Sequence, residues 1–144
     1  MTTALWTLIA FAAWTLFVLM TGVGTRRWYL ILSRRANLTS FPGDVAHGSD
    51  AYRRATRAHA NCVENLPVYA AIVLTAETAH LLPPHMDMLA LTFIVCRIAQ
   101  SSIHMLLPET NVTVAIRFSF FLAQVIAMVW MIAAIATLGS ARIA

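Results

Sequence analysis

Charged side chains are scarce in this chain of 144 residues: Lys, Arg, Asp and Glu make up 11% of it, whereas 60% is hydrophobic and the mean hydropathy is +0.73. A soluble domain carries about 25% charged residues. A water-soluble fold of this size cannot hide so much apolar surface, so the composition excludes that class. Several segments approach or exceed the roughly 20 apolar residues that a bilayer-spanning helix needs, which predicts an integral membrane protein.

Lysine is absent, so all ten basic residues are arginine and the formal net charge is +4. The planar guanidinium group of arginine binds carboxylates bidentately, which suits recognition of an acidic ligand better than general solubility. Arg97 and Arg117 lie inside otherwise apolar runs, and most of the others lie between the first two hydrophobic segments. This distribution is not typical of nucleic-acid binding, and we expect no nucleic-acid partner.

Cysteine is also rare. Cys62 and Cys96 both fall in expected helices, without Cys-x-x-Cys spacing, and we interpret them as small apolar packing residues. His47, His80 and His85 share no ligand spacing with an acidic residue. We therefore expect no metal site.

Four hydrophobic segments with short connections use the whole chain, so we expect one domain over residues 1–144. The predicted fold class is all-α, an integral membrane four-helix bundle. Its helices are expected at roughly residues 4–36, 50–78, 85–107 and 112–139. Ser49 or Asp50 can cap the second helix, and Pro108 ends the third.

Arginines also predict the orientation. Six of them lie between the first segment and the apolar body of the second: Arg26, Arg27, Arg34, Arg35, Arg53 and Arg54. The positive-inside rule makes this connection cytoplasmic and places both termini on the opposite side. Short loops and the absence of a retention or lipid-anchor signal favour a bacterial inner membrane.

Polar residues recur along one face of the second helix. Arg57, Asn61 and Glu64 are spaced by 4 and 3 residues, which places them in a stripe about 60° wide. Near the end of the third helix, Arg97, Gln100 and His104 repeat this spacing in reverse order. Arg117 enters from the same side of the membrane.

Polar groups that converge at one membrane level predict a binding site. The alternative is a structural ion-pair network of Arg57, Glu64 and Arg97 between helices. In the apolar bodies of the helices, three arginines face only Glu64, which leaves an excess of about two positive charges. That excess favours an anionic ligand with carboxylates.

The stretch RAHANCVENLP at residues 57–67 resembles the second helix of the family of membrane-associated proteins in eicosanoid and glutathione metabolism, the MAPEG family. This family includes microsomal glutathione transferases, the leukotriene-forming synthase and microsomal prostaglandin E synthase. SRRA at 33–36 is similar to the basic end of its first helix, and CRIA at 96–99 to its third. Arg117, with Gln124 two turns further on, resembles the start of its fourth helix.

The resemblance implies a homotrimer that holds one glutathione at each subunit interface. Arg57, Asn61 and Glu64 would bind the carboxylates, amide and amine of the tripeptide, and Arg34 or Arg35 of a neighbouring subunit would close over it. The implied glutathione-binding set is Arg34, Arg35, Arg57, Asn61, Glu64, Asn65, Arg97, Gln100 and His104.

Arg117 would be the catalytic residue, nearest the sulfur, where a guanidinium group favours the thiolate. Eicosanoid-forming members carry pocket tyrosines where this chain has Gln100 and His104, and their thiol-activating arginine would fall nearer Asn111. We therefore expect a glutathione transferase or peroxidase for detoxification. Glutathione would be the co-substrate, and the second substrate a lipophilic electrophile or hydroperoxide from the lipid bilayer.

Two other classes remain open. A non-catalytic scaffold would keep the fold while binding another membrane protein or lipid. A small-molecule transporter of the small multidrug exporter kind would need an acidic residue in the first helix, which carries none. The Met and Phe residues from Phe118 to Met131 are expected to face lipid or to pack a trimer.

Overall fold

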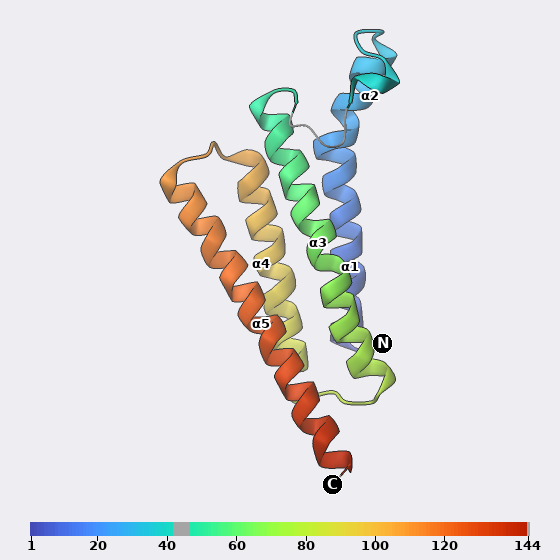
Figure 1. Ribbon diagram of the computed structural model, residues 1–144, viewed down its shortest axis with the longest axis vertical. Coiled ribbons are helices and arrows are strands. Elements are labelled where there is room, and N and C mark those ends of the chain that lie inside the picture. Colours follow the sequence, from blue (N-terminus) through green and yellow to red (C-terminus); the bar gives the residue numbers. More distant parts are fainter. Residues whose placement is uncertain (42–46, 144) are drawn as a thin grey trace.

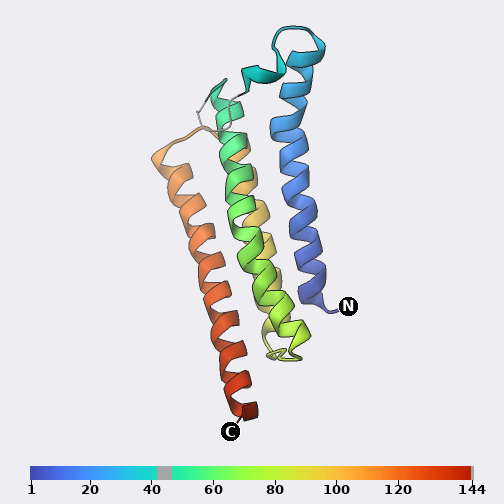
Figure 2. The same cartoon turned by 45° about the vertical axis from the view of Figure 1, so that its right-hand side comes forward.

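The computed structural model describes residues 1–41 and 47–143, and each element found there is a helix. The helices form four rods that run alternately up and down, with both termini toward the same end (Figures 1 and 2). The first rod consists of α1 (Thr3–Val18), the π-helical η1 (Leu19–Gly24) and α2 (Thr25–Leu32). A short 3-10 helix, η2 (Leu38–Ser40), follows it. The other three rods are α3 (Asp50–Thr78), α4 (Met86–Leu106) and α5 (Asn111–Ile143). The predicted all-α four-helix fold is confirmed.

Three of the rods are long and apolar enough to cross a bilayer: Thr3–Leu32, Met86–Leu106 and Asn111–Arg142. Among the described helices, α3 is also long, with 29 residues, but it is less apolar than these three rods. Its first half carries Arg53, Arg54, Arg57 and Glu64. It packs against α1, α4 and α5 along one face, whereas Val63, Val68 and Leu74 are exposed on its other side.

The first rod ends at Leu32, not near residue 36 as predicted, because a left-handed residue terminates it. Arg34 has φ of 55°, and the N–H of Arg35 donates to the carbonyl of Leu30 at 2.9 Å. The N–H of Arg34 donates to the carbonyl of Ile31 at 3.0 Å. This Schellman arrangement satisfies the last carbonyls of the helix and turns the chain away from its axis.

The last rod continues to Ile143, beyond the predicted end near residue 139. Its final turn is held by Arg142, whose guanidinium donates to the carbonyls of Ala79 and His80 at 3.0 and 2.9 Å. These carbonyls belong to the end of α3, so the extension also caps a neighbouring helix.

Aromatic rings join α1, α3 and α4 in the middle of the bundle. Tyr69 and Phe93 stack with ring centroids 3.9 Å apart, and Phe11 meets Phe93 edge-on at 5.3 Å. The hydroxyl groups of Tyr69 and Thr7 lie within 2.7 Å of each other. The three ring side chains are fully buried, and they lie beneath the polar half of the molecule.

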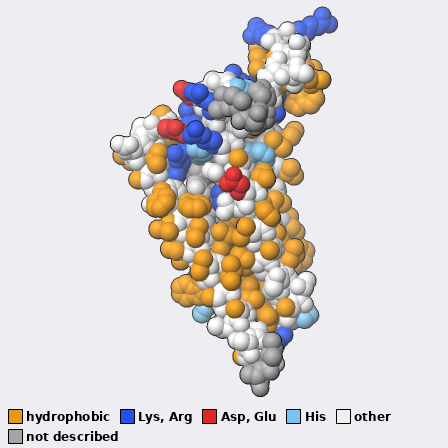
Figure 3. Space-filling view, in the orientation of Figure 1, with side chains coloured by type: hydrophobic (Ala, Val, Ile, Leu, Met, Phe, Trp, Pro, Cys, Tyr) orange, Lys and Arg blue, Asp and Glu red, His pale blue; other side chains and the backbone are white. Residues whose placement is uncertain are grey.

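On the face shown in Figure 3, most of the arginine and acidic side chains gather in the upper half, and apolar side chains cover much of the lower half. The upper half holds the α2 tip, the start of α3, the end of α4 and the start of α5. The polar residues of the candidate site come from α3 as far as Asn65, from the second half of α4, beginning at Arg97, and from the start of α5.

Candidate functional site

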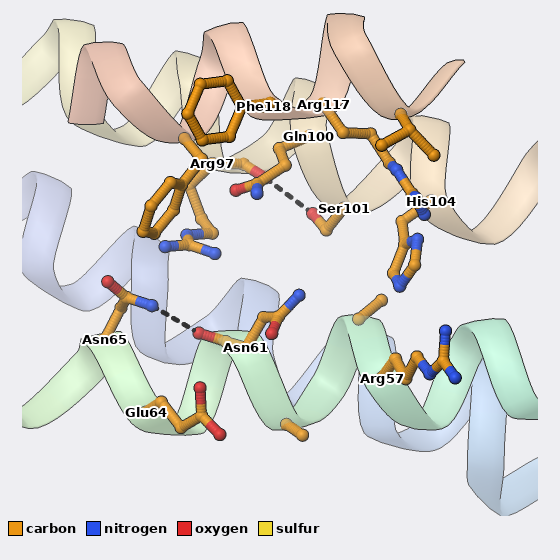
Figure 4. Close-up of a pocket in the computed structure, with 14 residues that line it drawn as sticks. Arg57, Asn61, Glu64, Asn65, Arg97, Gln100, Ser101, His104, Arg117 and Phe118 are labelled. Carbon is orange, nitrogen blue, oxygen red and sulfur yellow. Dashed lines mark hydrogen bonds between the residues drawn. The ribbon is translucent and has the colours of Figure 1, made fainter. Parts of the chain in front are cut away.

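A pocket of about 590 Å³ opens between α3, α4 and α5 in this arginine-rich half (Figure 4). Its volume lies within the range of small-molecule sites, about 300–1,000 Å³. The residues that line it are Arg57, Ala58, Ala60, Asn61, Glu64, Asn65, Arg97, Gln100, Ser101, His104, Val114, Arg117, Phe118 and Phe121. Eight of the ten residues expected at a site are in this list, and Arg34 and Arg35 are not.

The α3 side of the pocket is the stripe that the spacing predicted. Arg57, Asn61 and Glu64 share one helical face, and Asn65 continues it. The Nδ2 of Asn65 donates to the backbone carbonyl of Asn61 at 2.8 Å, which fixes the Asn65 amide against its own helix. The small side chains of Ala58 and Ala60 leave room for a ligand beside these polar groups.

Arg97 of α4 is the most buried charged residue of the pocket, with an exposed fraction of 1%. Its guanidinium lies over the rings of Phe11 and Phe93, 5.7 and 5.9 Å from their centroids. Figure 4 shows it pointing from α4 toward α3, between Asn61 and Asn65. Its Nε and Nη2 have no hydrogen-bond partner among the described residues.

The rest of the α4 wall is held by hydrogen bonds behind the pocket. Gln100 Oε1 accepts from Nε2 of the buried Gln124 at 3.0 Å. Ser101 Oγ accepts from the Trp14 indole at 2.7 Å. His104 is buried rather than lipid-facing, and its Nδ1 has no partner within the described part of the chain. Gln100 and Ser101 are thus fixed, whereas His104 keeps a free nitrogen for a ligand.

Arg117 brings a third guanidinium to the pocket from α5, with its side chain 15% exposed. Its Nη1 lies 3.7 Å from Oε1 of Glu109, and the same oxygen accepts a hydrogen bond from Nη1 of Arg57 at 3.2 Å. One carboxylate of the α4–α5 connection therefore bridges α3 and α5 across the mouth of the pocket. No pattern in the sequence marked Glu109, because this contact depends on the path of the connection.

The alternative, an ion-pair network of Arg57, Glu64 and Arg97, is not found within ion-pair distance among residues 1–41 and 47–143. Glu64 is exposed, and it lies two turns, about 10 Å, along the helix axis from Arg57. Arg57 pairs instead with Glu109. The inferred charge excess also changes, since three arginines now face Glu64 and Glu109, which leaves one positive charge rather than two.

Arg34 and Arg35 lie at the exposed tip beyond α2, which projects past the other helices (Figure 1). Arg35 donates to the Tyr29 hydroxyl at 3.4 Å. Within one chain, neither arginine lines the pocket.

Phe118 and Phe121 were expected to face lipid or a trimer interface, yet they line the pocket as well as being exposed. Phe121 follows Arg117 by four residues, so helical spacing could have placed it beside Arg117, whereas the position of Phe118, the next residue, does not follow from that spacing. Ser101 follows Arg97 by four residues and was detectable in the same way. The pocket therefore has an apolar edge that faces outward.

Together these groups suit a small acidic ligand. Guanidinium groups bind carboxylates through paired hydrogen bonds, and the amide of Asn61 can donate and accept. No group of three His, Cys, Asp or Glu side chains suited to a metal ion occurs in the described ranges.

Comparison with known proteins identifies one family. The family model described as the MAPEG family matches residues 3–137, nearly the whole chain. No curated protein and no solved structure shows a significant match. The family match includes the first three rods, α5 as far as residue 137 and every residue that lines the pocket. The chain therefore belongs to the MAPEG family.

Proposed function

We propose that this protein is a membrane-bound glutathione transferase or peroxidase that binds glutathione in the pocket between α3, α4 and α5. The MAPEG family includes glutathione transferases and also non-enzymatic members. The observation that carries the proposal is the buried Arg97, which has two unpartnered nitrogens and points into a pocket with two further arginines. A buried guanidinium without a carboxylate is costly, and a ligand carboxylate would compensate it.

Each part of glutathione finds a suitable group. Arg57 at the mouth and Arg97 at the floor can take its two carboxylates, and Asn61 can bind a peptide amide. Glu64 can accept from the ammonium group. The site would therefore bind a peptide that carries a carboxylate at each end.

Arg117 is the proposed thiolate-stabilising group. A free thiol has a pKa of about 8.5, so it is mostly protonated at neutral pH. Lowering that value by about two units needs about 2.7 kcal/mol of differential stabilisation, within the reach of one desolvated guanidinium contact. The thiol proton would leave to solvent through the open mouth of the pocket. His104, with its free Nδ1, is a further candidate for hydrogen bonding to the sulfur.

The second substrate would reach the sulfur from the bilayer along Phe118 and Phe121. In conjugation, the thiolate forms a carbon–sulfur bond and the leaving group departs with its electron pair. With a hydroperoxide, the thiolate attacks the O–O bond, so the hydroperoxide is reduced to an alcohol and glutathione is oxidised to a sulfenic acid. A second glutathione then converts the sulfenic acid to the disulfide and water.

Orientation and assembly are part of the proposal. With the arginine-rich end in the cytoplasm of a bacterium and both termini outside, the pocket would open toward a cytoplasmic supply of glutathione. In a homotrimer, the projecting α2 tip would carry Arg34 or Arg35 to the pocket of a neighbouring subunit. Their exposure in the single chain is compatible with this role.

A non-catalytic scaffold is the second candidate, because Glu109 already pairs with Arg57 and lies near Arg117 in the free protein. In that case the arginines would serve the bundle rather than a ligand. Activity measurements separate the two functions.

The test is glutathione conjugation to an aryl halide, and reduction of an organic hydroperoxide, by the purified protein in lipid nanodiscs. Ultraviolet difference absorption at the thiolate band is recorded over a pH series. The wild type should catalyse at least one reaction and show thiolate below the pKa of free glutathione. Arg117→Ala should lose about tenfold or more in rate and most of the thiolate signal, whereas Arg53→Ala, outside the pocket, should retain both. A wild type with neither activity nor a thiolate signal would favour the scaffold.

A further inference from the structure

Glu109 lies beside the pocket and contacts two of the arginines that line it. Its Oε1 accepts from Arg57 Nη1 at 3.2 Å and lies 3.7 Å from Arg117 Nη1. Two of the three pocket arginines are therefore partly neutralised by the protein itself. The third, Arg97, has no carboxylate partner among the described residues.

The backbone around Glu109 is fixed, but its side chain is not enclosed. Thr113 Oγ1 donates to the carbonyl of Pro108 at 2.8 Å and accepts from the N–H of Thr110 at 2.9 Å, which caps the start of α5. The side chains of Glu109 and Arg57 are 45% and 66% exposed. Ion pairs this exposed are weak, so rotation of one side chain is enough to release the arginines.

Charge balance gives this release a consequence. With Glu109 in place, the three arginines of the pocket face the carboxylates of Glu64 and Glu109. The net charge is then +1 if His104 is neutral. With Glu109 turned into water, the net charge is +2. Glutathione with an ionised thiol carries about −2, and with a protonated thiol about −1. The pocket without Glu109 thus matches the thiolate form.

We propose that Glu109 is an internal competitor of the ligand: a carboxylate of glutathione displaces it from Arg57, and this displacement frees Arg117 to stabilise the thiolate. The inference rests on the proposed function and adds a regulatory residue to it. Glu109 would thereby couple binding of the carboxylate end to ionisation of the sulfur. The thiolate would form mainly when a ligand with a carboxylate is in place.

The test compares glutathione titrations of the wild type, Glu109→Gln and Asp50→Asn by calorimetry, with thiolate absorption followed over pH. Asp50 is the matched control, because it is an exposed carboxylate paired with Arg53 at the same end of the molecule, outside the pocket. Glu109→Gln should lower the Kd about fivefold and shift thiolate formation to lower pH. Asp50→Asn should change the Kd less than about twofold.

Weaker binding by Glu109→Gln would overturn the proposal, since it would make Glu109 a residue that holds the arginines in place. An unchanged Kd with an unchanged thiolate titration would also overturn it. If the wild type and Glu109→Gln both fail to bind, the proposed function itself fails, and the competitor role fails with it. Binding by the wild type therefore separates the two conclusions.

Discussion

The indole Nε1 of Trp14 in α1 donates a 2.7 Å hydrogen bond to Oγ of Ser101 in α4, and that hydroxyl donates to the carbonyl oxygen of Arg97 at 2.7 Å. Ser101 lines the pocket, whereas Trp14 lies behind it. The first helix therefore sets the position of the pocket wall from which Arg97 extends. Loss of the indole donor should therefore weaken ligand binding in the pocket, although no residue that lines the pocket is changed.

Trp14→Phe should raise the Kd for glutathione about threefold and lower the free energy of unfolding by about 1 kcal/mol, because one partly buried hydrogen bond is lost. Calorimetry and reversible unfolding in mixed micelles measure these two quantities. Trp6→Phe is the control, since Trp6 is on the same helix and exposed. Equal effects of both substitutions would contradict a specific role for the Trp14 hydrogen bond.

Arg97 should contribute to glutathione binding without stabilising the fold. It is buried, has no carboxylate within ion-pair distance among the described residues, and lies over two aromatic rings. Arg97→Met should therefore leave the free energy of unfolding unchanged or raise it by about 1 kcal/mol, while glutathione binding weakens about tenfold or more. Thermal unfolding in detergent measures the stability, and calorimetry measures the affinity for glutathione. A strongly destabilised variant would instead indicate that Arg97 holds the bundle together.

How much of the site could be predicted follows from where its residues lie. Arg57, Asn61 and Glu64 were predictable, because helical periodicity alone places them on one face. The level at which α4 meets them was also predictable, because antiparallel helices with short connections bring the end of one beside the start of the next. The same helical spacing places Ser101 beside Arg97 and Phe121 beside Arg117.

Glu109 and Arg34 were not predictable in this way. The Glu109 ion pair depends on the three-dimensional path of a connection, and no periodicity describes a connection. The end of α2 depends on Arg34 adopting a left-handed conformation, which favours glycine and is uncommon for arginine. Both features result from tertiary structure and local backbone geometry rather than from residue spacing.

The bond between Gln100 and Gln124 predicts a non-additive pair. Gln124→Met should lower the free energy of unfolding by about 1 kcal/mol, because it leaves Gln100 Oε1 without its donor. The double variant, with Met at both positions, should lose less than the sum of the two single variants. Equilibrium unfolding of the four proteins gives this double-mutant cycle. Additive losses would show that the two amides do not stabilise each other.

Orientation can be tested with single cysteines in a background of Cys62→Ala and Cys96→Ala. Ser33 and Ser140 are exposed at opposite ends of the bundle. In intact bacterial cells, a membrane-impermeant maleimide should label Ser140→Cys and spare Ser33→Cys, because the arginine-rich end should be cytoplasmic. The reverse labelling pattern would invert the topology and place the pocket mouth outside.

The most direct test of the central claim is a calorimetric titration of the purified wild type with glutathione, alongside Arg57→Ala and Arg53→Ala. These two arginines lie one helical turn apart on α3, and only Arg57 lines the pocket. We predict saturable binding by the wild type and Arg53→Ala, and affinity about tenfold or more weaker in Arg57→Ala. No heat of binding from the wild type at millimolar glutathione, or equal affinity in all three proteins, would contradict the assignment of this pocket.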